Sequence, residues 1–354
     1  MTKKFFMVLG MSLLVLLMVT AIGCGETADD AGEPEEEPAE ETEETTEEPA
    51  ETGEVITLEA VSYWSAHLKD NIPLHYFVDK VNEELGDRVE IVMLGGPEVV
   101  SVPDQAEALN TGVIDFLYFP ADFYIPYVPE IDALKLSKVS PLEMHENGAH
   151  EFFDQLMQEK GNAKYFGQMN VGPEWFGIYT DTKIESIDDF NGMIFRTIPA
   201  YEAFLQKLGI ECTRLSWEEL LTAMDRGTID GFAHSISGGF DIGVHEAADY
   251  LVKPFFYYGA ASLLMNLDAW NSIPDDIKPE IERIAYEAQE YGFEWAAEEY
   301  NRSIEGMIGA GLEIIELPPE DAEQFLVTAE EAGWEEIAAR SPENVDRIRE
   351  LLTK

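Results

Sequence analysis

The chain has 354 residues, 45% of them hydrophobic, so it is long enough for a large core and for two lobes. Its formal net charge is −49, which argues against nucleic acid as a partner because the phosphate backbone would be repelled. Net charge bears on solubility and association rather than on a pocket, so it does not identify the charge of a ligand.

Residues 1–23 are predicted to be a lipoprotein signal peptide. Lys3 and Lys4 supply a positive start, an apolar run covers residues 5–22, and small residues precede Cys24. The sequence Ala-Ile-Gly-Cys resembles the lipobox of bacterial lipoproteins, which implies that Cys24 carries lipid and becomes the mature N-terminus. A plain transmembrane anchor is the alternative, because an apolar run of this length could just span a bilayer.

Residues 24–54 are predicted to be the lipidated cysteine followed by an acidic, disordered tether. After Cys24 this segment contains no aromatic and no basic residue, so it cannot bury enough apolar surface to order itself. An acidic binding tail is the alternative. The other cysteine, Cys212, is expected to be a small buried strand residue rather than half of a disulfide.

The globular part begins with alternating strand and helix patterns. Strands are predicted at 54–63, 88–94 and 112–118, with a helix at 71–85 that ends at a glycine. Trp64 follows the first strand, and Phe119 opens an aromatic loop that is expected after the third. Both aromatic residues are therefore candidates to line a ligand site at the strand ends.

A short pattern occurs twice in the chain. Residues 108–115 and 223–230 both read as the end of a helix, a glycine cap and the start of a strand that carries Ile-Asp. The repetition predicts two similar α/β lobes, and a cleft between two such lobes is a natural place for a small ligand.

Residues 184–234 form the most informative stretch. A short strand ends at Arg196, a helix and a second strand follow, and Ser216-Trp-Glu-Glu219 is a capping box that opens another helix. A further strand begins near residue 228 and leads to His234. This alternation of strands and helices predicts a parallel sheet with Arg196 and His234 near strand ends, where open α/β sheets bind ligands.

This stretch resembles the extracytoplasmic solute-binding proteins of TRAP transporters, of the DctP type. The residues that carry the resemblance read I-x-S-x-D-D-x-x-G-x-x-x-R from 184, L-G at 208, S-x-x-E at 216, A-M at 223 and G-x-I-D-G at 227. The ordered set is specific where one motif would be weak, and the order of elements matches over nearly all of residues 55–354.

The resemblance implies a two-lobed α/β fold of the periplasmic-binding-protein kind, with a hinge, a ligand cleft between the lobes and a long helix that spans both. Lobe I is expected to comprise 55–173 and 262–300, and lobe II 174–261 and 301–354. The long helix is expected at about 274–308, and helices are expected at 319–338 and 341–352.

The resemblance also assigns roles to residues. Arg196 falls on the family's carboxylate-binding arginine, and a guanidinium matches a carboxylate with two parallel hydrogen bonds. Trp217 falls where an aromatic residue often lines the cleft, with helix packing as the alternative. His234 occupies a frequent asparagine position, where it could donate a hydrogen bond and add a pH-dependent charge; a satisfied core histidine is the alternative.

One departure from the family narrows the ligand. Sialic-acid-binding members carry a second arginine about twenty residues before the first, where this chain has Glu174 and Trp175. A monocarboxylate with an apolar or hydroxylated body is therefore favoured over a dicarboxylate. Glu174 could meet a ligand amine or a bridging cation, or it could be a solvated loop acid. No cofactor is expected, and a bridging metal ion stays an alternative.

No enzyme motif stands out. His145 and His150 are five residues apart, so they diverge on a helix and do not form a zinc pair. The prediction is a non-enzymatic, lipid-anchored receptor outside the cytoplasm that delivers a small organic acid to TRAP permease subunits. A receptor that feeds a membrane sensor, and an extracellular enzyme on the same scaffold, are the alternatives.

Overall fold

The computed structural model describes residues 55–259 and 261–353, which belong to one compact unit, Glu51–Lys354. The predicted signal peptide, Cys24 and the acidic tether lie outside the described residues. The side chains of Trp217 and Glu218 are also outside what is described.

The first of two sheets has the strand order β2-β1-β3-β10-β4. Its central strand β3 pairs in parallel with β1 and antiparallel with β10, which also pairs antiparallel with β4. The strands are β1 (Ile56–Ser62), β2 (Val89–Gly95), β3 (Phe116–Pro120), β4 (Ala163–Asn170) and β10 (Ala261–Asn266). A strand from late in the chain thus completes a sheet that the first half begins.

The second sheet has the order β11-β9-β5-β8-β6-β7. As predicted from residues 184–234, β6 is parallel to both β7 and β8, and its last residue, Arg196, pairs with Thr213 of β7 and Phe232 of β8. The strands are β5 (Phe176–Thr180), β6 (Ile194–Arg196), β7 (Glu211–Thr213), β8 (Gly231–Ser235), β9 (Tyr250–Phe256) and β11 (Glu313–Glu316).

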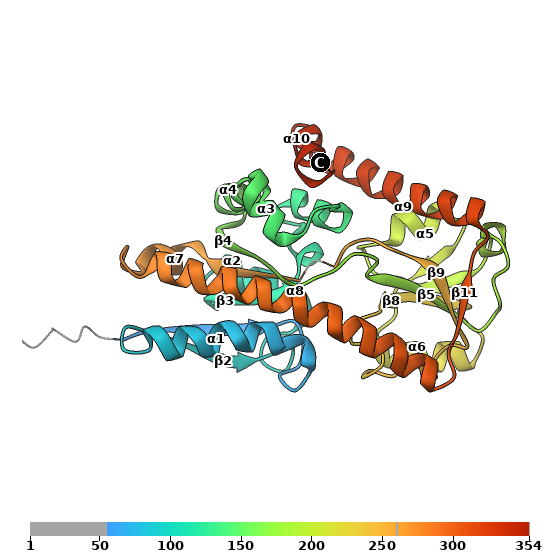
Figure 1. The fold of residues 1–354 in the computed structure, drawn as a ribbon, viewed down its shortest axis with the longest axis horizontal. Helices are drawn as coiled ribbons and strands as arrows, with labels where there is room; N and C mark the ends of the chain where they lie inside the picture. Colours follow the sequence, from blue (N-terminus) through green and yellow to red (C-terminus); the bar gives the residue numbers. More distant parts are fainter. Residues whose placement is uncertain (1–54, 260, 354) are drawn as a thin grey trace, which may run out of the picture. The chain divides into compact units, whose positions relative to one another are not determined.

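Helices cover both sheets (Figure 1). The long helix α8 (Lys278–Gly309) packs its first half in the core of the first sheet, through Ile281 and Ala288, and its last turns against the second, through Met307. The other helices are α1 (Ile72–Leu85), α2 (Val102–Asn110), α3 (Pro141–Asn147), α4 (Ala149–Gly161), α5 (Glu202–Lys207), α6 (Trp217–Asp225), α7 (Leu267–Ser272), α9 (Pro319–Arg340) and α10 (Val345–Thr353).

Short 3₁₀ segments connect these elements, and three of them matter for the site. They are η1 (Lys69–Asn71), η2 (Ala121–Tyr124) and η3 (Pro129–Leu136). The two others are η4 (Ile187–Phe190) and η5 (Val244–Glu246).

The repeated sequence pattern is also a repeated structure. In the first copy the N–H of Asp115 donates to the carbonyl of Glu59, whose own N–H donates to the Asp115 carboxylate at 2.8 Å. In the second copy Asp230 makes the same two bonds with Ile194, again with 2.8 Å to the carboxylate. Each aspartate therefore fixes the entry of a strand beside its parallel neighbour.

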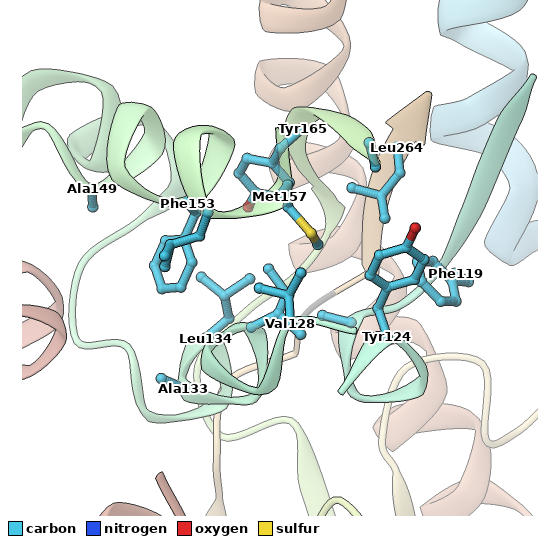
Figure 2. Packing of buried hydrophobic residues seen from close by; sticks show 14 of the residues in the cluster. Phe119, Tyr124, Val128, Ala133, Leu134, Ala149, Phe153, Met157, Tyr165 and Leu264 are labelled. Atoms are coloured by element: carbon cyan, nitrogen blue, oxygen red, sulfur yellow. The ribbon is translucent and has the colours of Figure 1, made fainter. Parts of the chain in front are cut away.

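The structure corrects the prediction for the third strand, which begins at Phe116 rather than at 112 and runs through Phe119. Phe119 is 1% exposed and its ring meets Tyr124 edge-on, within the hydrophobic cluster between β3, η2 and α4 (Figure 2). The predicted aromatic loop is therefore partly strand, and Phe119 is a core residue.

Two features of the helices bear on the packing. Gly148 adopts a left-handed conformation with φ of 83°, which separates α3 from α4. At the end of the chain, Ile348, Leu351 and Leu352 of α10 pack in the core that holds β3 and α4. Among the described helices, none is long and apolar enough to cross a membrane.

Candidate functional site

A cavity of about 160 Å³ lies where residues of the two sheets meet. The first sheet and its connections contribute the residues that follow β1 and β3, together with η3 and the end of β4. The second sheet contributes the start of β5, the end of β6 and the end of β8. Its polar lining residues are Tyr63, Asp70, Asp122, Asp132, Lys135, Asn170, Arg196, Tyr201, His234, Ser235 and Tyr258.

Arg196 lies at the end of β6 and lines the cavity as predicted. Its Nε donates to the carbonyl of Leu215 at 3.3 Å and its Nη1 to the hydroxyl of Tyr201 at 3.4 Å. Tyr201 in turn donates to the carbonyl of Ala233 at 2.6 Å, which fixes its hydroxyl. Within the described part of the chain, Arg196 is in no salt bridge, so its charge faces the cavity without an acidic partner.

The other cation at the cavity, Lys135 of η3, is fully engaged by the protein. Its Nζ lies 3.0 Å from Asp132, 3.1 Å from Glu336 and 2.7 Å from the carbonyl of Ala200. Asp132 is also held by Arg340 at 2.7 Å. A buried ammonium with three acceptors has no donor left for a ligand, so Arg196 is the better anion anchor.

Two carboxylates besides Asp132 line the cavity. Burial raises the pKa of Asp122 to about 7; the charge of Asp132 raises this pKa further, and the charge of Lys135 lowers it. Burial likewise raises the pKa of Asp70 to about 6, with Glu299 and Asp241 adding and a hydrogen bond from Asn170 opposing. Among residues 55–259 and 261–353, no lysine or arginine lies within salt-bridge distance of either carboxylate. Desolvation without a counter-ion is the cause of both shifts.

His234 ends in the same cavity, on β8. Its Nδ1 lies 3.1 Å from the carbonyl of Ser235, which suits a neutral ring that donates from that nitrogen. Burial lowers the pKa of His234 to about 4. The hydrogen bond to the backbone of Ser235 raises this pKa, and the charge of Arg196 lowers it. The histidine is therefore neutral near pH 7, and Arg196 supplies the positive charge of the site.

The structure brings together four of the predicted side chains and separates two. Trp64, Trp175, Arg196 and His234 line the cavity. Phe119 does not, for the reason given above. Glu174 lies in a different groove, beside Lys138 and Tyr257, where its backbone has φ of 53°. Trp217 opens α6, but its side chain is among those not described.

Trp175 forms one wall through close contact with a glycine. Its indole is 7% exposed, and a Cβ on Gly259 would lie 2.4 Å from that ring. Gly259 is thus required where the chain returns to the first sheet, because any side chain would displace the aromatic wall.

Sequence reasoning missed Tyr63, Asp70, Asp122, Lys135 and Asn170. Asp122 lies in the segment predicted to be an aromatic loop, but in so acidic a chain no sequence feature distinguishes one carboxylate from the others. Tyr63 interacts electrostatically with Asp122, Arg196 and Asp70, and with burial as the main cause its pKa is raised to about 12. Such a convergence of distant segments is visible only in the folded chain.

A metal centre was a remaining alternative for this site. Among the described residues, no group of three or more histidine, cysteine, aspartate or glutamate side chains could hold a metal ion.

Comparisons with known proteins identify relatives of the whole fold. The curated C4-dicarboxylate-binding periplasmic protein DctP of Rhodobacter capsulatus is 25% identical over 255 residues, covering 71% of this chain and 69% of its own length. A TRAP periplasmic solute-binding protein from Ochrobactrum anthropi superposes with a TM-score of 0.73 at 19% identity, covering 84% of this chain and 95% of its own.

A second solved structure comes from Sulfitobacter and contains bound β-D-galacturonate. It superposes with a TM-score of 0.71 at 19% identity and covers 84% of this chain and 99% of its own. At such identities the structural likeness supports the fold. The family model described as bacterial extracellular solute-binding protein, family 7 (DctP), matches residues 61–341, and the chain therefore belongs to this family of extracytoplasmic solute receptors.

Proposed function

We propose that this receptor binds a small organic acid in the cavity between its two sheets and delivers it to the membrane subunits of a TRAP transporter. The observation that carries the proposal is Arg196, a guanidinium that faces a partly apolar cavity with no acidic partner among the described residues. A planar guanidinium held by Leu215 and Tyr201 is oriented before the ligand arrives, which suits two-point binding of a carboxylate.

The arrangement of the sheets supports closure around the ligand. We propose two lobes, one built on each sheet, joined by the crossings after β4 and after β9 and by α8. Hinged proteins of this kind close around a ligand that touches both lobes. Trp64 would contact the ligand from the first lobe, and Arg196, Trp175 and His234 from the second.

Carboxylate recognition is tested with matched pairs of acids and amides. We expect lactate, pyruvate or a longer monocarboxylate to raise the melting temperature of the dialysed protein, while the corresponding amide does not, because an amide offers no charge to Arg196. Chromatography of the released ligand should recover it unchanged, as for a receptor without enzymatic activity. Equal stabilisation by an acid and its amide would contradict carboxylate recognition.

We further propose that Cys24 anchors the receptor to the cell membrane through lipid, and that the acidic segment after it serves as a tether. The expected result is that Cys24→Ser abolishes partition into a detergent phase and releases the protein from membranes. Cys212→Ser, in β7, serves as the control and should leave partition unchanged. Continued membrane association of Cys24→Ser would favour a transmembrane anchor instead.

A further inference from the structure

Three groups that offer acceptor oxygens to a ligand line the same cavity as Arg196. They are the carboxylates of Asp70, in η1, and Asp122, in η2, and the side-chain carbonyl of Asn170 at the end of β4. All three come from the side of the first sheet. The function proposed above assigns no role to these three acceptor groups.

Asn170 shows that the acceptors are not satisfied within the protein. The residue is 2% exposed, and its Oδ1 has no hydrogen-bond partner. Its amide group already interacts with Asp70, which leaves the carbonyl oxygen for something in the cavity. Buried polar atoms are nearly always paired, and leaving one unpaired costs about 1–3 kcal/mol. The unpaired oxygen therefore points to a ligand that donates.

The charges around the cavity lead to the same conclusion. Lys135 is paired with Asp132 and Glu336. Of the charged side chains that line the cavity, those with no salt bridge to a described residue are therefore Arg196 and the carboxylates of Asp70 and Asp122. A simple monocarboxylate would pair with Arg196 and leave Asp70 and Asp122 uncompensated. A ligand with a second, positively charged group would pair with all three.

We propose that the ligand is a zwitterionic amino acid, whose carboxylate binds Arg196 and whose protonated amine is held by Asp70, Asp122 and the Oδ1 of Asn170. The proposal rests on the proposed carboxylate site and adds the second recognition group. An ammonium offers three N–H donors and a positive charge, which matches three acceptors, two of them charged. A ligand hydroxyl offers one donor and no charge, so it satisfies this arrangement less well.

Both ends of such a ligand are within reach of one region of the cavity. Tyr63, Arg196, Asp70 and Asp122 all line the cavity, and the Tyr63 hydroxyl interacts electrostatically with the other three. The loop after β8 also approaches Asp70, because a Cβ on Gly238 would lie 3.3 Å from its carboxylate oxygens. The amine would thus be enclosed from both sheets.

The test compares ligands that differ only in the proposed group. The full chain, unfolded, dialysed and refolded to remove bound ligand, is titrated calorimetrically at pH 8 with three pairs: alanine and lactate, leucine and 2-hydroxy-4-methylpentanoate, phenylalanine and 3-phenyllactate. We expect at least one amino acid to bind 10-fold or more tightly than its hydroxy analogue. Asp70→Asn and Asp122→Asn should each weaken amino-acid binding by about 10- to 100-fold, as for a lost charge-assisted hydrogen bond.

Controls separate a local effect from a general one. The same two variants should leave hydroxy-acid affinity within about three-fold, and Asp79→Asn, an equal charge change at an exposed position of α1, should alter neither. The amine site is wrong if no amino acid binds. It is also wrong if hydroxy acids bind as tightly as amino acids and the two variants weaken both kinds of ligand equally. In that case, loss of hydroxy-acid binding in Arg196→Met would still uphold the proposed function.

Proton release gives a second readout that a structural role would not produce. Asp122 is faced by Asp132 and Lys135 from η3, by Tyr63 after β1 and by Tyr201 at the start of α5. Because its pKa is raised to about 7 in the free protein, an ammonium beside it should lower that pKa and expel protons on binding near pH 7. Amino-acid binding should therefore tighten from pH 5 to 8, while hydroxy-acid binding should not.

Discussion

Arg196→Met is expected to lower the affinity for the carboxylate ligand by roughly 10²- to 10³-fold, which is the largest effect on binding of any single substitution in the cavity. The substitution removes a charge and two donors, and each hydrogen bond to a charged group contributes about 1.5–3 kcal/mol. Stability should change little, because the hydrogen bonds of the Arg196 side chain to described residues are one to the carbonyl of Leu215 and one to the hydroxyl of Tyr201, both near the upper distance limit for a hydrogen bond. Calorimetric titration at pH 8 measures the affinity.

Two matched variants sharpen this prediction. Arg196→Lys keeps the charge but loses the planar fork, so we expect an intermediate loss of about 10-fold. Arg214→Met removes an arginine just after the neighbouring strand β7, where it pairs with Glu202 and its side chain is 66% exposed, and should leave affinity unchanged. If Arg196→Met and Arg214→Met bound the ligand equally, Arg196 would not be the carboxylate anchor.

Lys135→Met is expected to give the largest loss of stability, about 3 kcal/mol of unfolding free energy. The side chain of Lys135 is 6% exposed and that of Asp132 1%, so removing the ammonium leaves buried negative charge without its partner. Arg340 still reaches both Asp132 and Glu336, at 2.7 and 2.8 Å, which keeps the expected loss at the lower end for a broken buried pair. The melting temperature should fall by roughly 6–12 °C.

Lys138→Met is the control for this stability prediction. Lys138 is three residues further along and pairs with Glu330 at 2.7 Å, but their side chains are 56% and 44% exposed. Exposed pairs contribute about 1 kcal/mol or less, so this variant should melt close to the unchanged protein. Equal melting temperatures for the two variants would show that burial does not strengthen the Lys135 network.

Helices and strands were predicted correctly from the sequence where residues close together in the chain determine them. Ser216 and Glu219 form the predicted capping box, the long helix α8 lies where its pattern placed it, and β6 pairs in parallel with β7 and β8. Caps, glycine stops and apolar periodicity act within a few residues, so a sequence displays them directly. The repeated Ile-Asp pattern likewise predicted two equivalent strand entries.

Arg196 could be predicted as a site residue because a motif and a strand end coincided there. The carboxylates could not, because Asp70 and Asp122 are two among 71 acidic residues and only burial without a cation distinguishes them. Phe119 misled the prediction because β3 continues to Pro120 and so includes a residue that was expected to begin a loop. Strand boundaries depend on pairing with β1 and β10, which are far away in sequence.

The sequence by itself determined the family, the order of elements and the cation that can hold a carboxylate, because these depend on local patterns and on side-chain chemistry. Only the tertiary structure decided which charges remain unpaired. It paired Lys135 with Asp132 and Glu336, placed α10 against the core of the first sheet, and brought Asn170, Asp70 and Asp122 to the cavity that Arg196 faces. Electrostatic partners are chosen by distance in the folded chain, and that distance does not follow from separation in sequence.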